Sequence, residues 1–443
     1  MKKLVSKIWI VAAFIAVFAS CTSEVDDVFE KSSAERVSDA VKNDMSILTS
    51  ATNGWLMQIY GDLQYGGYNV LCNFNEDYTV TVASEMFASD LTATSHYKLA
   101  QSTGLILSFD EYNKVLHWFS DPENPEGWGT KGTGFGGDLE FRIISATEDR
   151  IELIGKKSAN KIIMTPMPIG ITWKDYLDQV KFVEEDMACA NVYTQVGEES
   201  VPTTLSYRRF SFTVKEGEAT ITKRAPFIIT PQGYEFYEPL EINGKTVKGF
   251  KFEKGAISYD NTDDPTVKLV CVVPPLNEQL CNGKWYFSKN EMNPTQAALW
   301  QQLANEVKAY AKWNYKPISY AYLGAYTRNG VTQPGLVVSS TYTGHIYFVT
   351  ELVGDDAITF THMDSSLGLI NAKSYLNYFP TFIPVLNLFT EVTYNKKTTG
   401  EAKTFKLETD NLKAPTYIKI TDTSDPTNSY KLVPTKVSNP FGT

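Results

Sequence analysis

The spacing of apolar residues along this chain switches between two periods. Between residues 33 and 51 they recur every three or four positions, as on one face of an amphipathic helix. After Asn53 the period falls to two, which is typical of strands with one buried face. The helical positions are Val37, Val41, Met45 and Leu48, and the first alternating positions are Trp55, Met57 and Ile59.

Short apolar segments then follow one another at intervals of about ten residues. The connections between them are rich in Gly, Asn and Asp, which favour tight hairpin turns. This series predicts an antiparallel meander that curls into a barrel or a sandwich. The predicted strands are 55–59, 68–72, 78–82, 97–99, 105–109, 115–119, 139–143, 151–154 and 161–164.

The order of helix and then strands recurs twice more along the chain. Helices are predicted over 173–187 and 295–313, and a β-rich run over 205–274 separates them. The densely apolar stretch 375–389 contains Pro380 and Pro384, which break any helix, so we expect a buried or edge-covering segment there. The last predicted strands are 336–339, 345–350, 357–361, 404–408, 417–420 and 430–433.

The N-terminus has a pattern of its own. A basic start, an apolar core too short to span a bilayer and two small residues before a cysteine are typical of a bacterial secretory signal. The end of this pattern resembles the lipobox of bacterial lipoproteins, which implies that the Cys21 sulfur is lipidated and Cys21 becomes the mature N-terminus. An ordinary signal peptide with a chance cysteine is the alternative. The elements are Lys2, Lys3 and Lys7, then 8–18, then Ala19, Ser20 and Cys21.

These patterns predict a mainly β protein with a few helices, of the α+β class. Its antiparallel meanders form barrel- or sandwich-like domains, each preceded by an amphipathic helix. Pro166 and Pro168 mark a domain end, and Pro274 with Pro275 marks a second boundary. The expected organisation is a signal peptide at 1–20, an acidic tether at 21–32, a domain at 33–168 and a C-terminal domain at 169–443, which divides into 169–275 and 276–443.

The charge excludes some partners. The formal net charge is −10, and removal of Lys2, Lys3 and Lys7 with the signal peptide takes it to −13. Phosphates repel so acidic a chain, so we expect no nucleic-acid partner, and the lipid rather than charge must hold the protein on a membrane. The acidic residues at 24–27 resemble the signal that sends lipoproteins of Bacteroidota to the outer face of the outer membrane. This resemblance implies a lipid-anchored protein that faces the cell exterior.

Four cysteines remain besides Cys21. In an exported protein they allow one or two disulfides, and Cys271 and Cys281 are the closest pair in sequence. They are equally compatible with small buried apolar side chains, so the pairing stays open. The four are Cys72, Cys189, Cys271 and Cys281.

Catalytic motifs are missing from the sequence. No two of the four histidines, His96, His117, His345 and His362, lie within five residues of each other, although His345, His362 and Asp364 could meet across strands. No G-x-S-x-G nucleophile elbow occurs. The G-x-G-x-x-G spacing that begins at Gly132 precedes a strand rather than a helix, which argues against a nucleotide site. We therefore predict no catalytic residue, no metal site and no cofactor.

One long connection stands out, between residues 120 and 138. It is too long for a hairpin, and its glycines predict a mobile segment. Trp128 and Phe135 lie on it and Trp118 precedes it. Aromatic rings on a loop can stack on sugars or on peptide side chains. These three residues are the candidate ligand-binding residues; alternatively, Trp118 belongs to the core and Trp128 plugs the end of the barrel.

Four phrases of the chain resemble an uncharacterised family of surface lipoproteins from gut Bacteroidota. The resemblance covers nearly the whole mature chain and implies genes beside SusC-like and SusD-like importers of glycans or peptides. It implies no catalytic residue. The phrases are LILSFDEYNKVLHWFSDP at 105–122, GGDLEFRII at 136–144, GYEFYEPL at 233–240 and TDTSDPTNSYKL at 421–432.

Three functional hypotheses follow. The first is a non-catalytic, surface-exposed outer-membrane lipoprotein that binds a glycan or peptide nutrient or helps to deliver it to an importer. The second is a surface hydrolase of glycans or peptides that uses carboxylates dispersed in the sequence, because no pattern excludes a facing pair. The third is a structural component of the envelope or of adhesion.

Overall fold

The computed structural model describes residues 32–102, 104–124, 126–328, 331–364 and 371–442. The signal peptide at 1–20, Cys21 and nearly all of the tether predicted at 21–32 lie outside these residues. The chain divides into two compact units, which we describe separately. Among the described residues, the N-terminal unit comprises the chain up to Glu185 together with Leu205–Ser211 and Lys223–Leu240, and the C-terminal unit comprises Asp186–Thr204, Phe212–Thr222 and the chain from Glu241 onwards.

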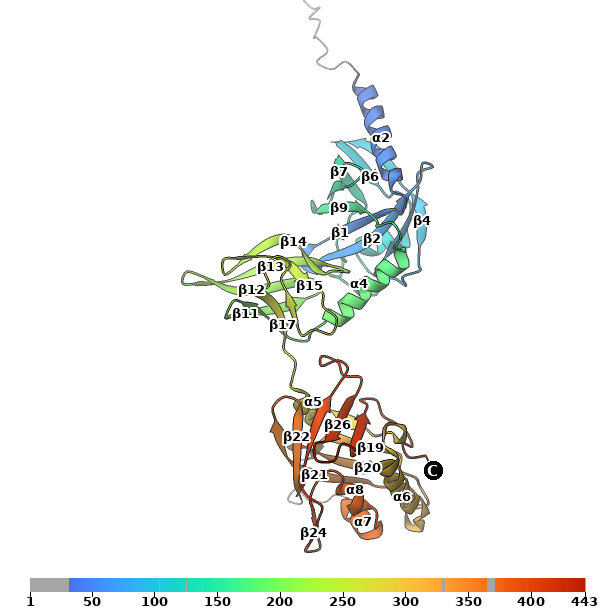
Figure 1. The fold of residues 1–443 in the computed structure, drawn as a ribbon. Helices are drawn as coiled ribbons and strands as arrows, with labels where there is room; N and C mark the ends of the chain where they lie inside the picture. The colour runs from blue at the N-terminus through green and yellow to red at the C-terminus, as the bar shows by residue number, and fades with distance from the viewer. Residues whose placement is uncertain (1–31, 103, 125, 329–330, 365–370, 443) are drawn as a thin grey trace, which may run out of the picture. The chain divides into compact units, whose positions relative to one another are not determined.

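The N-terminal unit is built on a nine-stranded antiparallel sheet (Figure 1). Its strand order is β4-β3-β2-β1-β9-β8-β7-β6-β5. Apolar residues on one face of each strand form its core, because successive side chains alternate between the two faces of a sheet. The strands are β1 Trp55–Tyr60, β2 Gly67–Phe74, β3 Thr79–Ser84, β4 Ala93–His96, β5 Lys98–Ser102, β6 Gly104–Ser108, β7 Glu140–Ala146, β8 Ile151–Gly155 and β9 Lys161–Pro166.

This sheet curls until its edges meet. Strands β4 and β5 lie at opposite ends of the strand order, yet only Tyr97 separates them in the chain. Two edges joined by one residue must lie close together, so the sheet is barrel-like. Tyr97 is fully buried at this seam, and its hydroxyl group lies within hydrogen-bond distance of two acceptors, the Met45 sulfur and the backbone oxygen of Asn75.

The first helix of the described chain, α2 (Ser33–Ser50), begins and ends where the periodicity predicts. Ser32 and Glu35 form a capping box, in which each side chain accepts a hydrogen bond from the other residue's backbone N–H. Leu48 and Met45 on its apolar face pack against the barrel core. The Trp55 indole N–H donates to the backbone oxygen of Leu48 and ties the helix to β1.

One predicted strand is wrong. Residues 115–119 belong to a short helix, α3 (Lys114–Ser120), rather than to a strand. Asn113 caps it through its side-chain oxygen, which accepts hydrogen bonds from the N–H groups of Val115 and Leu116. Alternation was misleading here because Val115, Leu116, Trp118 and Phe119 are all buried, and a short apolar run fits a helix as well as a strand. The helix predicted at 173–187 is present as α4 (Trp173–Met187).

The second sheet has eight strands in the order β15-β14-β13-β12-β11-β10-β17-β16. Strand β10 pairs antiparallel with both β11 and β17. The Asn243-Gly244 turn expected from the sequence joins β14 to β15, with both residues at positive φ. The strands are β10 Val192–Val196, β11 Glu199–Ser206, β12 Arg209–Glu216, β13 Ala219–Thr230, β14 Gly233–Ile242, β15 Lys245–Lys251, β16 Ser258–Asp260 and β17 Val267–Cys271.

The third sheet, in the C-terminal unit, is also barrel-like. Its order is β18-β19-β20-β21-β22-β25-β26-β27, and the chain just beyond β27 returns to β18, where Tyr286 and Val433 exchange two backbone hydrogen bonds. An apolar core fills it. The strands are β18 Lys284–Tyr286, β19 Tyr320–Arg328, β20 Val331–Ser339, β21 Thr343–Val353, β22 Ala357–Asp364, β25 Lys403–Glu408, β26 Ile418–Asp422 and β27 Ser429–Leu432, with a separate hairpin of β23 Val392–Tyr394 and β24 Lys397–Thr399.

The helices of the C-terminal unit follow the predictions in part. Helix α6 (Pro294–Ala309) starts at the predicted Pro294 and ends before 313, where a short 3-10 turn, Ala311–Trp313, follows. The stretch 375–389 is buried as expected, but it contains two short helices instead of none. Pro384 is tolerated because it lies in the first turn of its helix, where no backbone N–H is needed. The short helices are α5 Leu276–Asn282, α7 Ala372–Tyr378 and α8 Phe382–Leu386.

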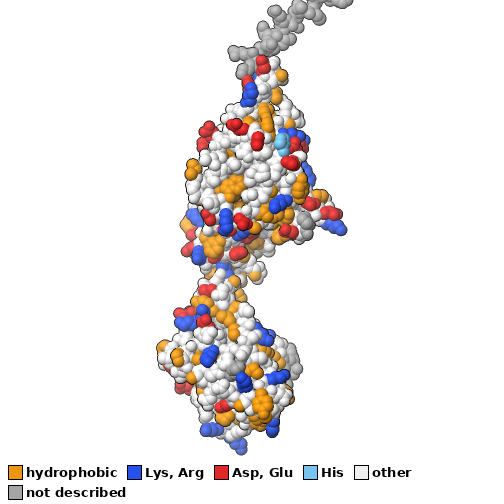
Figure 2. Space-filling view, turned by 90° about the vertical axis from the view of Figure 1, so that its right-hand side faces the viewer, with side chains coloured by type: hydrophobic (Ala, Val, Ile, Leu, Met, Phe, Trp, Pro, Cys, Tyr) orange, Lys and Arg blue, Asp and Glu red, His pale blue; other side chains and the backbone are white. Residues whose placement is uncertain are grey.

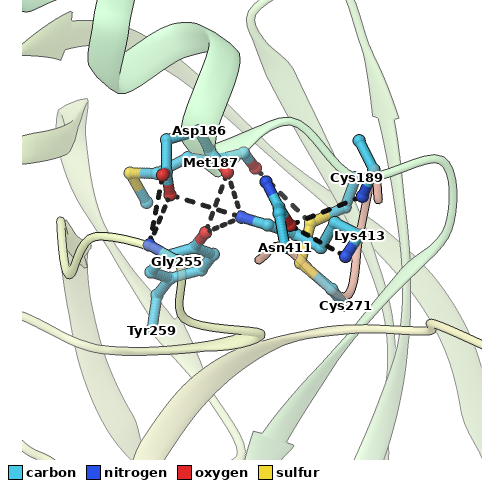
Figure 3. Close-up of a disulfide and its surroundings, with 9 residues drawn as sticks. Asp186, Met187, Cys189, Gly255, Tyr259, Cys271, Asn411 and Lys413 are labelled. Atoms are coloured by element: carbon cyan, nitrogen blue, oxygen red, sulfur yellow. Dashed lines mark hydrogen bonds and ion pairs between the residues drawn. A yellow bond between two sulfur atoms is a disulfide. The ribbon is translucent and has the colours of Figure 1, made fainter. Parts of the chain in front are cut away.

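A disulfide joins Cys189 to Cys271, whose Cα atoms are 5.6 Å apart (Figure 3). The pair closest in sequence is therefore not the bonded one, and Cys72 and Cys281 are free thiols. Beside the disulfide, the Lys413 ammonium group donates a hydrogen bond to the backbone oxygen of Asp186. It donates another to the Tyr259 hydroxyl group, at a distance of 2.5 Å. Burial lowers the pKa of Lys413, and the nearby Asp186 carboxylate opposes that shift.

The fold class predicted from the sequence is confirmed. The structure is mainly antiparallel β with a few helices, and two of its sheets are barrel-like. The physical reason is local, because each hairpin pairs strands that are neighbours in the chain and each alternating segment buries one face.

Candidate functional site

The long connection at 120–138 joins α3 to β7, and hydrogen bonds hold it at several points. The Gly137 N–H donates to the backbone oxygen of Phe119 at 2.8 Å, and the Asp62 N–H donates to that of Phe135 at 2.7 Å. The Asn124 side chain donates to the backbone oxygen of Trp118 at 3.1 Å. The loop is therefore attached to the barrel at both ends and in its middle.

Some glycines of this loop allow the backbone to approach its neighbours closely, whereas Gly127 and Gly132 have no atom within 4 Å of where a Cβ would lie. Gly134 has a φ of +55°, and a Cβ atom there would lie 2.0 Å from the backbone oxygen of Asp121. A larger residue could not adopt this conformation without displacing the neighbouring backbone. Gly134 in turn donates to the backbone oxygen of Thr130 at 2.7 Å.

Two of the three predicted ligand-binding residues lie in the core. Trp118 is 5% exposed and Phe135 is 2% exposed, and their ring centroids are 4.9 Å apart. Phe135 also packs against Tyr65 and Tyr68 of the barrel. Because both rings are buried, neither can stack directly on a ligand that arrives from solution. Their packing instead holds the loop against the barrel.

Trp128 is the predicted residue that faces solvent, at 42% exposure. Its ring is stacked over Phe135 at a centroid distance of 6.2 Å, and it lies 6.3 Å from Tyr207, which is 51% exposed. We call Trp128 and Tyr207 the aromatic platform. The buried rings of Phe135 and Tyr65 support it, because Tyr65 meets Tyr207 edge-on at 4.9 Å.

Tyr207 was not found by sequence reasoning, because it lies 79 residues beyond Trp128, in the turn between β11 and β12. The signal was present in the chain as the phrase SYRRF, which has no Gly or Asn at the turn. Tyr207 adopts a φ of +51°, a left-handed conformation that a bulky side chain rarely occupies. Such a conformation costs free energy and persists where the surroundings hold it, which often marks a functional position.

Arg208, next to Tyr207, is the buried anchor of this turn. Its guanidinium group binds both oxygens of the Glu85 carboxylate at 3.0 Å and both oxygens of the Glu184 carboxylate at 2.9 Å. It also donates to the backbone oxygen of Gly67 and lies 4.2 Å from the centre of the Tyr68 ring. Two forked ion pairs of this kind fix the position of the guanidinium group and hence of the turn.

Further contacts complete the environment of these charges. Glu85 accepts hydrogen bonds from the backbone and the side chain of Asn69, at 2.5 and 3.0 Å, and Tyr176 of α4 donates to Asn69. Burial acts to lower the pKa of Arg208, but the carboxylates of Glu85 and Glu184 outweigh it and raise that pKa. The turn that carries Tyr207 therefore rests on a permanently charged, fully paired arginine.

A pocket of about 330 Å³ lies beside Trp128, within the range of typical small-molecule sites. Its lining includes Pro122, Asn124 and Thr130, together with the charged side chains of Glu123 and Lys131. The Thr130 hydroxyl group is hydrogen-bonded to that of Tyr65 at 2.5 Å, which joins the pocket wall to the barrel. The platform and this pocket together offer an aromatic surface bordered by polar groups.

A model of the family described as Domain of unknown function (DUF4302) matches residues 25–254. The match spans more than half of the chain. The chain belongs to the DUF4302 family. The DUF4302 region contains the aromatic platform, the loop at 120–138 and the Arg208 ion pairs. The resemblance to an uncharacterised family is confirmed at this level.

Other comparisons carry no functional argument. No curated protein matches the chain. Among solved structures, the β subunit of DNA polymerase from Streptococcus pyogenes is similar at 11% identity, with 91% of this chain and 98% of that chain covered and a TM-score of 0.12. The β subunit of DNA polymerase III from Thermotoga maritima gives 10% identity, coverage of 90% and 97%, and the same TM-score of 0.12. Scores this low describe no shared fold.

The histidines are dispersed in the DUF4302 region and beyond it. His96 is hydrogen-bonded to Asp110, and His345 stacks on Tyr326 at 3.6 Å. His362 lies opposite Val349 in the sheet, and Asp364 opposite Tyr347, so neither is the cross-strand neighbour of His345. Within the described parts of the chain, no group of three or more His, Cys, Asp or Glu side chains could hold a metal ion.

The free thiols are poor nucleophiles. Burial raises the pKa of Cys72, which is completely enclosed in the barrel core. Burial and the neighbouring Glu278 raise the pKa of Cys281 to about 11. Reactive cysteines need a lowered pKa, because the thiolate is the attacking species.

Three acidic side chains in the adjacent pairs at 263–264 and 355–356 form ion pairs with lysines. Asp264 is bound by Lys245 and Asp263 by Lys248, while Asp356 is bound by Lys406. Hydrogen bonds from Lys245 and Thr266 lower the pKa of Asp264 to about 2. A carboxyl group with so low a pKa stays ionised and cannot act as the proton donor that glycoside hydrolysis requires.

The face drawn in Figure 2 has Lys and Arg side chains interspersed with Asp and Glu in each unit, without a basic patch. Orange apolar side chains lie among them as separate groups. None of the helices in the described part of the chain is long and apolar enough to cross a membrane.

Proposed function

We propose that this protein is a non-catalytic lipoprotein, anchored in the outer membrane through Cys21 and facing the cell exterior. It binds a glycan or a peptide on the aromatic platform and helps to deliver it to an importer of the SusC and SusD kind. The setting in Bacteroidota and the importer come from the resemblance of the chain to surface lipoproteins. The aromatic platform is the structural feature that supports a binding role.

The observation that supports binding is the exposure of two large rings on a rigid support. Trp128 and Tyr207 remain 42% and 51% exposed although a packed aromatic cluster lies directly beneath them. Two adjacent exposed rings offer a flat apolar surface, and aromatic side chains are frequent anchors of binding sites. Because Arg208 and the loop hydrogen bonds hold the rings in advance, little conformational entropy is lost when a ligand binds.

Replacement of Trp128 by Ala tests the platform. We expect the free energy of unfolding to change by no more than about 1 kcal/mol, since the ring is largely at the surface. Binding to the cognate glycan or peptide, found by screening oligosaccharide and peptide arrays, should weaken by about tenfold or more. Differential scanning fluorimetry and isothermal titration calorimetry measure the two effects.

The matched control is Tyr112→Ala, which removes another exposed ring, at 73% exposure, from the same unit. It should leave binding unchanged. A loss of about 3 kcal/mol or more in Trp128→Ala, with binding per folded molecule intact, would instead identify Trp128 as a plug of the barrel. Hydrolysis of the bound ligand by the purified protein would favour the alternative hypothesis, that the protein is a surface hydrolase.

The anchor is tested by Cys21→Ser. This change removes the acyl acceptor, so the protein should move from the membrane to the soluble fraction after cell lysis. Retention in the outer membrane after a high-salt wash would contradict lipid anchoring. Protease treatment of intact cells expressing the unmodified chain checks the orientation, because only an outward-facing protein is digested.

A further inference from the structure

A second pocket, of about 570 Å³, lies where the outer face of the first sheet meets the start of α4. In strands β2 and β3, Cys72, Val80 and Val82 point into the barrel core. Asn73 and Thr81, which alternate with these residues and are cross-strand partners, therefore face outwards into the pocket. The chain just before and at the start of α4 forms the opposite wall, with Thr172 and Trp173.

The chemistry of the lining is polar and uncharged. Amide groups come from Asn53 and Asn73, and hydroxyl groups from Thr52, Thr81 and Thr92. No Lys, Arg, His, Asp or Glu side chain is among the lining residues. This composition differs from that of the pocket beside Trp128, where Glu123 and Lys131 contribute charges.

Several of these groups are available for a ligand. Thr81 is engaged with Thr94, since their hydroxyl groups are 2.9 Å apart. The Asn73 amide and the hydroxyl groups of Thr52 and Thr92, in contrast, make no hydrogen bond to another residue of the described chain. A side-chain amide can donate and accept at once, which suits the paired hydroxyl groups of a sugar ring.

The apolar wall of the pocket is held in place. The Trp173 indole N–H donates to the backbone oxygen of Asn53 at 2.8 Å. The Asn53 side chain donates in turn to the backbone oxygens of Pro168 and Ile171, at 2.8 and 2.9 Å. Ile171 lines the pocket and is 42% exposed. A fixed indole ring and an exposed aliphatic side chain provide contact for the C–H groups of a sugar.

We propose that this pocket binds a neutral carbohydrate. Its polar groups recognise hydroxyl groups, its apolar wall contacts the ring, and the lack of lining charge favours an uncharged ligand over an acidic or basic one. This pocket is separate from the one beside Trp128, since the two pockets have no lining residue in common.

A peptide fits this site less well. An extended peptide gains affinity by pairing its backbone with a free strand edge. Strands β2 and β3 are interior strands of the sheet, with neighbours on both sides, so their backbone groups are already paired. Recognition on this face must therefore use side chains that stand up from the sheet.

The test uses the purified full chain and a panel of probes. The panel contains neutral oligosaccharides of glucose, mannose, xylose and galactose, an acidic oligogalacturonate, and a glycine- and serine-rich peptide. At least one neutral oligosaccharide should bind by isothermal titration calorimetry. Asn73→Ala and Thr92→Ala should each weaken this binding by about tenfold, because each removes a hydrogen bond from the complex. Both variants should fold, since neither side chain contacts another residue through a hydrogen bond.

The control is Asn191→Ala, which removes an exposed amide from outside the pocket and should leave binding unchanged. Binding of the neutral sugar at this pocket should also persist in Trp128→Ala, because that change removes a ring of the separate aromatic platform. If no neutral oligosaccharide binds even at millimolar concentration, or if Asn73→Ala weakens binding of the acidic sugar or the peptide instead, the assignment is overturned. Loss of sugar binding in Trp128→Ala with retention in Asn73→Ala would overturn this pocket and support the platform.

Discussion

Replacing Arg208 with Met is expected to lower the free energy of unfolding of the N-terminal unit by about 3–5 kcal/mol. The reason is the carboxylate that remains behind. The Glu85 side chain is only 1% exposed, and Arg208 supplies two of its hydrogen bonds. Without the guanidinium group, the folded state would contain a buried carboxylate with no cationic partner. This unpaired charge lowers the free energy of unfolding.

The control within the same network is Glu184→Gln. Glu184 binds Arg208 with similar distances, but its side chain is 46% exposed and water can replace the lost partner. We therefore expect a change of about 1 kcal/mol or less. Glu85 and Glu184 contact the same guanidinium group but differ in burial. A difference between the two variants therefore measures the effect of burial rather than the effect of having an ion pair.

Urea unfolding measures the loss of stability, and hydrogen exchange at the β2 amides locates this loss in the N-terminal unit. The second measurement is needed because a chain of two units need not unfold in one step. The Arg208→Met variant should also weaken ligand binding at the platform, because Tyr207 precedes Arg208 in the same turn. A loss smaller than about 1 kcal/mol in Arg208→Met would show that Glu85 does not depend on the guanidinium group.

The second large effect is expected from the disulfide. Cys189 and Cys271 are separated by 82 positions in the sequence, and a cross-link over such a loop restricts the unfolded chain strongly. The chain-entropy model gives about 4.5 kcal/mol for a loop of this length. Cys189→Ser should therefore destabilise the C-terminal unit by up to that amount.

Reduction provides an independent measurement. Dithiothreitol should lower the unfolding midpoint of the unmodified protein and of Cys281→Ala by the same amount, because Cys281 is a free thiol. It should have no further effect on Cys189→Ser. An equal response of all three proteins to reductant would mean that the Cys189–Cys271 bond does not contribute.

The neighbouring residues give the disulfide variant a second readout. Lys413 contacts Asp186 and Tyr259 beside the cross-link, and its ammonium group lies 5.2 Å from the centre of the Tyr259 ring (Figure 3). Loss of the disulfide should loosen this cluster. Hydrogen exchange at the Gly255 N–H, which donates to the Asp186 carboxylate at 3.0 Å, should then become faster.

The sequence alone determined the features that depend on neighbours along the chain. The period of the apolar residues predicted α2, α4 and α6 and most strands, because a helix or a hairpin forms between residues close in sequence. The β-rich class followed from these elements. The same local reasoning failed at 115–119, where a four-residue apolar cluster has no distinguishing period, and at Pro384, where the first turn of a helix accepts proline.

Only the tertiary structure decided which distant residues meet. The sequence placed Trp128 on a long loop, but its exposure, and its proximity to Tyr207, depend on how the loop and a remote hairpin pack on the barrel. It contained Arg208, Glu85 and Glu184 without any sign that they pair, and it could not select Cys189 as the partner of Cys271. Charge pairing, disulfide pairing and pocket formation all depend on contacts between residues far apart in the chain, and no local periodicity encodes those contacts.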